Sequence, residues 1–371
     1  MYQRSIVEKT LVKLKKVPIL VPLFVTLVCI YGFIILYSAA DGSLEPWALR
    51  QIMIFCVLMP FAFVVAIIDL KYIYKFSYIF YFFTLLLLIA AHFFGKTVMG
   101  ATRWIDLGFI HLQPSEPAKI AVVLMLARYF HGLKTIDGSI NISHMIIPLI
   151  GVLIPAALII KQPDLGTGII TIIVATVIFF ASGIRVSYFV VSIFVSLASL
   201  PLIWSLLHNY QKNRVLIFLD PGKEPLGSGY NIIQSKISIG SGGFFGKGLL
   251  NGTQSHLNFL PEYETDFIFS FLAEELGFVG GMLLLILYFM IIISSLAVAI
   301  NAKSIFAKLM TTGLASIFFS HVFINMAMVM GMVPVVGVPL PLISYGGTMM
   351  VSVLICFGLI MNVGVHQHSK L

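Results

Sequence analysis

Charged residues are scarce in this chain. They make up only 10% of its 371 residues, whereas hydrophobic residues make up 59% and the mean hydropathy is +1.03. Soluble domains carry about 25% charged residues, so the composition excludes a soluble protein and indicates an integral membrane protein with several spans. The net charge of +8 belongs to no soluble basic domain, and it therefore gives no reason to expect nucleic-acid binding.

Cysteine is also rare, and several catalytic signatures are absent. Cys29, Cys56 and Cys356 all lie in apolar runs, so they indicate neither a disulfide framework nor a zinc site. The sequence contains no cluster of His and Cys with metal-ligand spacing, no Gly-x-Ser-x-Gly elbow and no P-loop. These absences exclude an elbow-type serine hydrolase and a P-loop nucleotidase.

Long apolar runs dominate the chain instead. Their length predicts an all-α polytopic membrane protein, a single membrane domain over 1–371 with about ten transmembrane helices. The runs lie at 17–39, 51–69, 76–94, 116–131, 143–160, 167–183, 187–207, 277–299, 308–330 and 345–365. The first run follows a basic cluster ending at Lys16, but it exceeds the roughly 7–15 apolar residues of a signal peptide. An even number of spans with basic short loops places both termini in the cytoplasm.

One long polar loop, at about 208–265, separates the seventh and eighth runs and is expected on the extracytoplasmic side. Nine glycines lie between Gly222 and Gly252, and glycine permits close backbone approach. Backbone N–H groups near Lys236 and Lys247 would suit a phosphate or pyrophosphate. A flexible surface loop is the alternative interpretation.

The stretch Leu260–Phe267 closes this loop and holds Glu262, Glu264 and Asp266. A carboxylate at the edge of a membrane is buried enough for its pKa to shift yet can still meet a substrate. We therefore take Asp266 as the leading catalytic candidate. The alternative is an aspartate that only complements a helix N-terminus. A short amphipathic interfacial helix is expected before the eighth run, because Glu274 and Glu275 interrupt the apolar sequence there.

Other polar residues lie at the edges of apolar runs. Ser115 is a candidate helix N-cap, and Glu116 and Lys119 would share one helix face as an i, i+3 pair. An exposed ion pair at a helix start is the alternative, and it would contribute little. Asp164 has the cap of the sixth run as its alternative role. The proline-broken stretch Pro334–Pro341 predicts a re-entrant or packed loop that lines a cavity.

Together these stretches resemble the SEDS family (shape, elongation, division and sporulation) over essentially the whole chain. The most specific matches are Gln113–Glu116 with Lys119, Gln162–Thr167, Gly229–Lys236, Leu260–Glu262 with Thr265–Phe267, and Gly337–Pro341 with Ser344–Gly347. The residues around Gln234–Gly243 are similar to those of the elongation branch of the family rather than to those of the division branch.

The resemblance implies a peptidoglycan glycosyltransferase that polymerises lipid II at the outer face of the plasma (inner) membrane during cell elongation. It also implies a class B penicillin-binding protein and the elongation machinery as partners. The essential aspartate of the family maps onto Asp266, and its buried ion pair maps onto Glu116 and Lys119.

The implied transfer inverts the sugar, because lipid II carries an α-linked pyrophosphate and the glycan is β-linked. One general base, Asp266, is then sufficient. The leaving pyrophosphate needs positive charge, for which a divalent cation (Mg²⁺ or Mn²⁺) is also expected, with Asp266 as a candidate ligand. The candidates for binding substrate or pyrophosphate are Arg103, Trp104, Gln113, Asp164, Lys236, Lys247, Glu262 and Ser344.

Two other classes of function use the same features. Charges and broken helices within a membrane would also serve a lipid II flippase. A scaffold for cell-wall machinery would use the long loop as a docking surface. A polymerisation assay separates these functions from an enzyme.

Overall fold

The computed structural model describes residues 6–98, 101–106, 111–133, 142–207, 209–224, 227–253, 259, 261–369 and 371. Within them, seven helices are long and apolar enough to cross a membrane. They are α2 (Leu20–Ala39), α3 (Ala48–Ile67), α4 (Leu70–Phe94), α6 (Ile146–Lys161) with the 3-10 turn before it, α13 (Ile268–Asn301), α14 (Ile305–Val329) and α15 (Gly347–Val365). Seven of the ten predicted runs are thus confirmed as helices of spanning length.

The other three runs also form helices. They are α5 (Ser115–Gly132), which carries Glu116, Lys119 and Arg128, the shorter α7 (Leu165–Ala181), and α8 (Val186–Ala198) followed by α9 (Leu200–Leu206). The run at 187–207 is therefore divided at Ser199. The mostly helical membrane fold is confirmed, while the count of ten spans stays a prediction.

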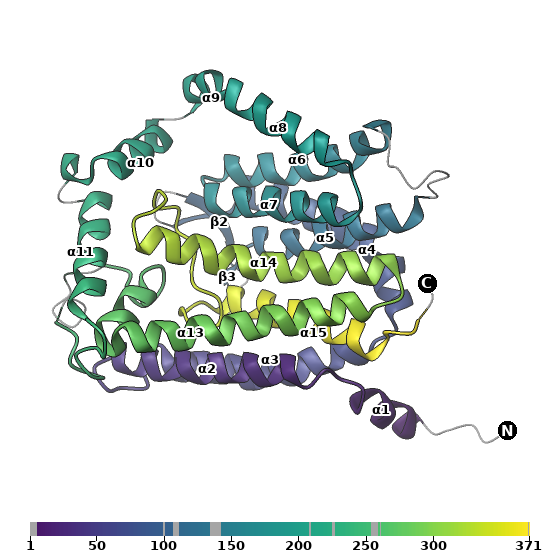
Figure 1. Ribbon diagram of the computed structural model, residues 1–371, viewed down its shortest axis with the longest axis horizontal. Coiled ribbons are helices and arrows are strands. Elements are labelled where there is room, and N and C mark those ends of the chain that lie inside the picture. The colour runs from purple at the N-terminus through teal and green to yellow at the C-terminus, as the bar shows by residue number, and fades with distance from the viewer. Residues whose placement is uncertain are drawn as a thin grey trace.

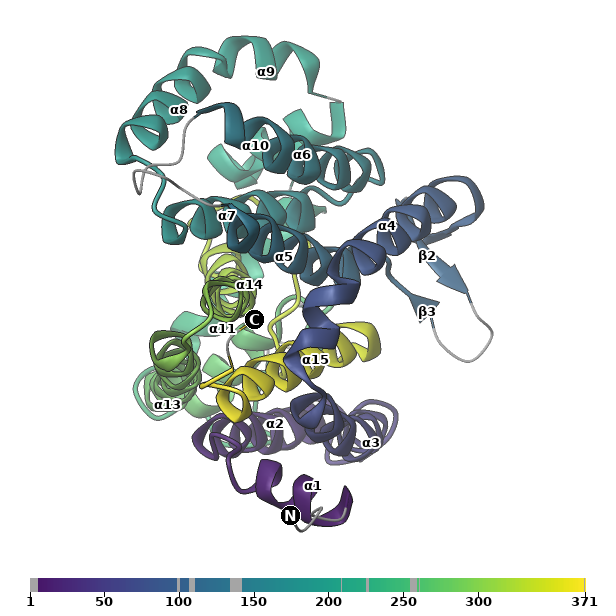
Figure 2. The same cartoon turned by 90° about the vertical axis from the view of Figure 1, so that its right-hand side faces the viewer.

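The long helices run roughly side by side along the longest axis (Figure 1). The short first helix, α1 (Ile6–Leu14), and the end of α15 lie at one end of the bundle (Figure 1). Viewed along this axis, α14 lies between α13 on one side and α5 and α7 on the other (Figure 2). Nineteen of its residues are buried, so α14 is the central helix of the packing.

Two loops at the opposite end of the bundle contain secondary structure of their own. Between α4 and α5, β1 (Lys96–Val98), β2 (Ala101–Asp106) and β3 (His111–Leu112) form an antiparallel three-stranded sheet in the order β1-β2-β3. The pattern of apolar and polar residues between the two helices does not predict this sheet. The long loop folds into α10 (Asn209–Leu219), the 3-10 turn η2 (Pro221–Lys223) and α11 (Ser228–Ser241), all at the end of the bundle away from α1 (Figure 1).

Helix α13 is kinked at Gly277, whose φ of 64° and ψ of −160° are not helical. The glycine-rich segment of the long loop packs into this kink, with Phe278 N–H and Val279 N–H donating to the carbonyls of Gly243 and Phe244. The expected separate helix before the eighth span is therefore present, but it is not amphipathic. Every residue from Ile268 to Glu275 is buried, because α11 and the glycine-rich segment cover this helix.

The segment between α14 and α15 is the predicted re-entrant loop. Its Pro341 carbonyl accepts a hydrogen bond of 2.7 Å from Tyr288 Oη, from the middle of α13. A Cβ atom on Gly32, in the middle of α2, would lie 2.8 Å from the Leu342 carbonyl oxygen, so the glycine permits this close approach. The loop thus enters the bundle, and its backbone is satisfied by buried partners, as non-helical chain at membrane depth requires.

Candidate functional site

The turn that carries Asp266 is held by its own backbone and by the re-entrant loop. The Glu262 carbonyl accepts from Thr265 N–H at 3.1 Å and from Phe267 N–H at 3.2 Å. From the loop, Tyr345 N–H donates to the Glu264 carbonyl at 2.9 Å, and Ser344 Oγ donates to the Thr265 carbonyl at 2.6 Å. The re-entrant loop therefore fixes the two residues that directly precede Asp266.

The Asp266 side chain is half-buried beside Gly337, where a Cβ atom would lie 3.4 Å from Asp266 Oδ2. No hydrogen bond to the carboxylate is seen among the described residues. Burial, together with the nearby charges of Glu262 and Asp164, raises the pKa of Asp266 to about 6 against the opposing effect of Arg103 and Arg214. A carboxylate with this pKa is mainly ionised at neutral pH and is well matched to accepting a proton.

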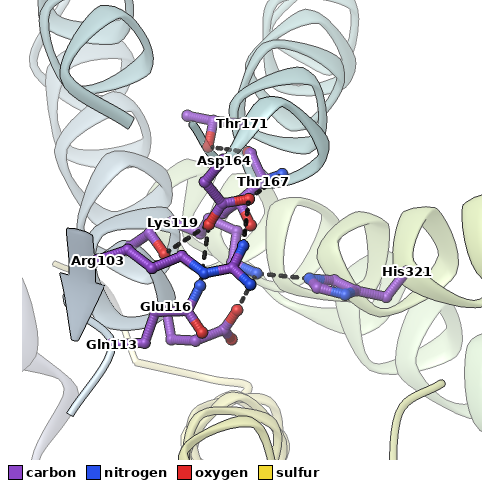
Figure 3. A network of polar contacts seen from close by, with 9 residues as sticks. Arg103, Gln113, Glu116, Lys119, Asp164, Thr167, Thr171 and His321 are labelled. Atoms are coloured by element: carbon purple, nitrogen blue, oxygen red, sulfur yellow. Dashed lines mark hydrogen bonds and ion pairs between the residues drawn. The ribbon is translucent and has the colours of Figure 1, made fainter. Parts of the chain in front are cut away.

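Asp164 is the centre of a second polar cluster (Figure 3). Its Oδ1 accepts from Thr167 N–H at 3.2 Å, which caps α7, and its Oδ2 accepts from Gln113 Nε2 at 2.9 Å and Ser115 Oγ at 3.4 Å. Arg103, on β2, approaches Asp164 Oδ1 at 3.9 Å. The predicted cap role of Asp164 is confirmed, and the cluster joins the sheet, α5 and α7.

The predicted N-cap at Ser115 is wrong. Pro114 occupies the cap position of α5, no side chain caps this helix, and the Ser115 hydroxyl is directed to Asp164 instead.

Glu116 and Lys119 form the predicted pair at the start of α5, with 2.8 Å between Lys119 Nζ and Glu116 Oε1. Both are buried, so the alternative of an exposed pair is wrong. Lys119 Nζ also contacts Nε2 of His321, on α14 (Figure 3). An ammonium group only donates, so His321 Nε2 accepts and its proton lies on Nδ1. The contact joins α5 to α14.

Several other candidates serve the architecture of the turn. Glu262 has a φ of 55°, and its Oε2 accepts from Thr265 Oγ1 at 2.9 Å. Ser344 is buried, and besides donating to Thr265 it accepts from Leu340 N–H at 2.7 Å. Both residues shape the position of Asp266. Trp104 is half-buried on β2, where it is paired in register with Lys96.

The two lysines of the long loop have different surroundings. Lys236 is exposed on α11 and lies against Gly331, at the end of α14. Lys247 Nζ is paired with Glu274 at 2.6 Å and with Thr253 Oγ1 at 2.7 Å. Glu274 lies two helical turns along α13 from Asp266. Lys247 is thus not brought to Asp266, and the glycines near it pack the kink.

Three residues near the site were not identified from the sequence. Arg214, on α10, contributes positive charge at Asp266, His321 contacts Lys119, and Asn325 donates to the Asp266 carbonyl at 2.8 Å. A histidine and an asparagine inside an otherwise apolar run were the available signal, since polar groups at membrane depth are costly unless paired.

Comparison with known proteins gives a consistent result. Residues 18–369 match the model of the FtsW/RodA/SpoVE family of cell cycle proteins. The peptidoglycan glycosyltransferase MrdB of Escherichia coli K12 is 46% identical over 292 residues, which cover 78% of each chain.

Two solved structures share the fold. One belongs to a peptidoglycan synthase complex that coordinates polymerization and crosslinking. It superposes with a TM-score of 0.82 at 29% identity over 94% of this chain and 97% of that one. The rod shape determining protein RodA of Thermus thermophilus gives a TM-score of 0.71 at 25% identity over 94% of this chain and 96% of that one.

Proposed function

Since this chain belongs to the FtsW/RodA/SpoVE family, the SEDS family, we propose that it polymerises lipid II with Asp266 as the general base. It is a peptidoglycan glycosyltransferase, like the relative with which it shares 46% identity. The product is a glycan strand made at the outer face of the plasma membrane during cell elongation. The observation that supports the role of Asp266 most is its desolvated carboxylate, which no described residue hydrogen-bonds.

The proposed reaction is a direct displacement with inversion. Asp266 removes the proton from the acceptor sugar hydroxyl, the 4-OH of a GlcNAc. The hydroxyl oxygen then attacks the anomeric carbon of the donor, and the bond from that carbon to the pyrophosphate breaks. One base is sufficient, and no sugar–enzyme bond forms.

The leaving lipid pyrophosphate needs hydrogen-bond donors and positive charge. Arg103 is suited to this role because its distance of 3.9 Å to Asp164 leaves a loose ion pair. Its Nε atom is buried without a hydrogen-bond partner among the described residues. A guanidinium with an open donor next to a fixed carboxylate is prepared to bind an oxyanion in a defined orientation. Asp164, which Gln113 holds by a hydrogen bond, lies beside Arg103.

A divalent cation, Mg²⁺ or Mn²⁺, is part of the proposal. No group of three or more His, Cys, Asp or Glu side chains that could hold a metal is found in the described part of the chain. Such ions nevertheless need only one or two carboxylates when a phosphate supplies further ligands. The Asp266 carboxylate fits this requirement. The ion would supply positive charge for the leaving pyrophosphate.

The proposed partner is a class B penicillin-binding protein, which crosslinks the strands that this chain makes. The support is the likeness to a chain of a peptidoglycan synthase complex. The helices of spanning length make the chain a multi-pass membrane protein. We place both termini in the cytoplasm, so the Asp266 turn faces the extracytoplasmic side, where the glycan is assembled.

The test is a polymerisation assay with the purified chain, its partner transpeptidase with the crosslinking site disabled, lipid II and Mg²⁺. A ladder of glycan strands on a gel is the expected result. A flippase would move lipid II across proteoliposomes without making polymer, and a scaffold would do neither. The proposal would be overturned if no polymer formed, whether or not the chain moved lipid II across the membrane.

A further inference from the structure

Asn325 is an asparagine in the interior of α14, with no exposed surface. Its Nδ2 donates one hydrogen bond of 2.8 Å to the Asp266 carbonyl and another of 2.7 Å to the Val338 carbonyl. One amide group thereby joins the turn that carries the candidate base to the re-entrant loop. A buried amide in an apolar bundle is costly unless its donors are satisfied, and both donors of Asn325 are used.

The carbonyl of Asp266 is not used by the helix that follows. At the start of α13, Ser270 N–H donates to Phe267 at 2.9 Å, three residues back, rather than to Asp266 four residues back. Asn325 supplies the hydrogen bond that the Asp266 carbonyl would otherwise lack. The backbone of the candidate base, Asp266, is thus held by a side chain from another helix, α14.

The second carbonyl that Asn325 binds lies in the wall of the site. Val338 follows Gly337, the residue beside the Asp266 carboxylate. Val338 also packs against Gly166, at the start of α7, directly after the cluster around Asp164. Asn325 therefore fixes the spacing between the Asp266 backbone and the loop that the Asp266 carboxylate faces.

The helix that presents Asn325 is itself held firmly. His321 lies one turn earlier on α14 and contacts Lys119 of the buried ion pair. Helix α14 also packs against α5, α7, α13 and α15. Such packing leaves Asn325 little freedom to shift, and a small displacement of a reacting group can cost about 100-fold in rate.

We propose that Asn325 is a positioning residue for the transfer, holding the Asp266 carboxylate at the acceptor hydroxyl through the Asp266 and Val338 carbonyls. The inference rests on the proposed function of Asp266. It predicts that Asn325 affects the rate of the bound complex and not the binding of lipid II, because Asn325 is buried behind the turn.

Asn362 offers a matched control. It is also fully buried, on α15, and its Nδ2 donates to the carbonyls of Val65, Ala66 and Ile68 at 2.8, 3.2 and 2.6 Å. These carbonyls belong to the end of α3, at the opposite end of the bundle from Asp266. Loss of Asn362 therefore removes the same chemistry from the same kind of environment without touching the site.

The experiment compares Asn325→Ala, Asn325→Leu, Asn362→Ala, Asn362→Leu and Asp266→Asn in the polymerisation assay, with the folded fraction measured by size-exclusion chromatography. Leucine fills the volume of asparagine without a polar atom, so it provides a folded variant if alanine leaves too large a cavity. For the Asn325 variants we expect kcat per folded molecule to fall about 10- to 100-fold while KM for lipid II changes less than about twofold.

The Asn362 variants should lose thermal stability but keep kcat per folded molecule within about twofold. Equal kcat values for the Asn325 and Asn362 variants would overturn the inference, as would a loss at Asn325 confined to KM. The Asp266→Asn variant separates the two levels of the account. If it keeps polymerising, the proposed function fails. If it is inactive while the Asn325 variants behave like the Asn362 variants, only the positioning role fails.

Discussion

Lys119 lies between a carboxylate and an imidazole: its Nζ atom is 2.8 Å from Glu116 Oε1 and also contacts His321 Nε2. All three side chains are buried. The arrangement satisfies the charge of Lys119 with one anion and one neutral acceptor, and it ties α5 to the central helix α14. A pair in this environment is sensitive to the loss of either partner, because the remaining charge is left without water.

Replacing Glu116 or Lys119 by alanine should therefore destabilise the protein by about 3–5 kcal/mol and abolish most polymerisation. The charge-swapped double variant, Glu116→Lys with Lys119→Glu, should recover part of both, since a pair forms again. Thermal unfolding in detergent and the polymerisation assay measure the two effects. Alanine variants with normal stability would show that removing one partner does not leave a costly unpaired charge.

Asp266 opposes folding when it is ionised. Its pKa is raised from 3.8 to about 6 in the folded protein, mainly by burial, so the folded state binds the proton more tightly than the unfolded chain. The destabilisation is full above about pH 6 and disappears as the pH falls toward 3.8. Asp266→Asn should thus be more stable than the natural chain by about 1–3 kcal/mol at neutral pH.

Unfolding temperatures measured at pH 4.5 and pH 7.5 test this expectation, with the exposed Asp41→Asn variant as the control. The difference between Asp266→Asn and the natural chain should be larger at pH 7.5. A difference that is larger at pH 4.5 would contradict the assigned direction of the pKa shift.

Removal of divalent cations should stop polymerisation, because the charge that develops on the leaving pyrophosphate would then face Arg103 alone. Adding EDTA should abolish glycan strands, and an excess of Mg²⁺ or Mn²⁺ should restore them. Full activity in EDTA, after the same treatment of the lipid II stock, would remove the cation from the account.

The topology can be tested with single cysteines in a chain whose natural cysteines are replaced. A cysteine at Ser43, exposed before α3, should react with a membrane-impermeant maleimide added to whole cells. One at His368, exposed after α15, should react only after the cells are opened. Labelling of the His368 position in intact cells would reverse the proposed orientation.

Periodicity and apolar length were sufficient to predict the helices, because each transmembrane segment must satisfy its own backbone. Every predicted run corresponds to a helix, including the run divided at Ser199. The sheet β1-β2-β3 was missed because its strands are short and polar, with no alternation long enough to exceed the background of a loop.

The site was predicted only where neighbours in the sequence interact. Glu116 and Lys119 are three residues apart on one helix, so their pairing follows from helix geometry. His321 is about 200 residues away from its partner Lys119, and Asn325 is about 60 residues away from its partner Asp266. No local rule specifies contacts at such separations. From the sequence, the glycines near Lys247 could permit close approach either of a phosphate or of another part of the chain. In the structure they pack against the kink of α13 at Gly277.

The measurement that bears most directly on the central claim is glycan synthesis by Asp266→Asn beside Glu264→Gln. Glu264 lies two residues from Asp266 in the same turn, and burial raises its pKa as well, so it matches Asp266 in location and chemistry. Asparagine retains the shape of aspartate but cannot accept a proton at neutral pH. Both variants should bind lipid II and the partner normally.

With purified chain, partner and lipid II, we expect the rate for Asp266→Asn to fall about 10²- to 10⁴-fold, while Glu264→Gln stays within about threefold of the natural chain. Glycan strands of normal length and rate from Asp266→Asn, or an equal loss from Glu264→Gln, would contradict the assignment of Asp266 as the general base.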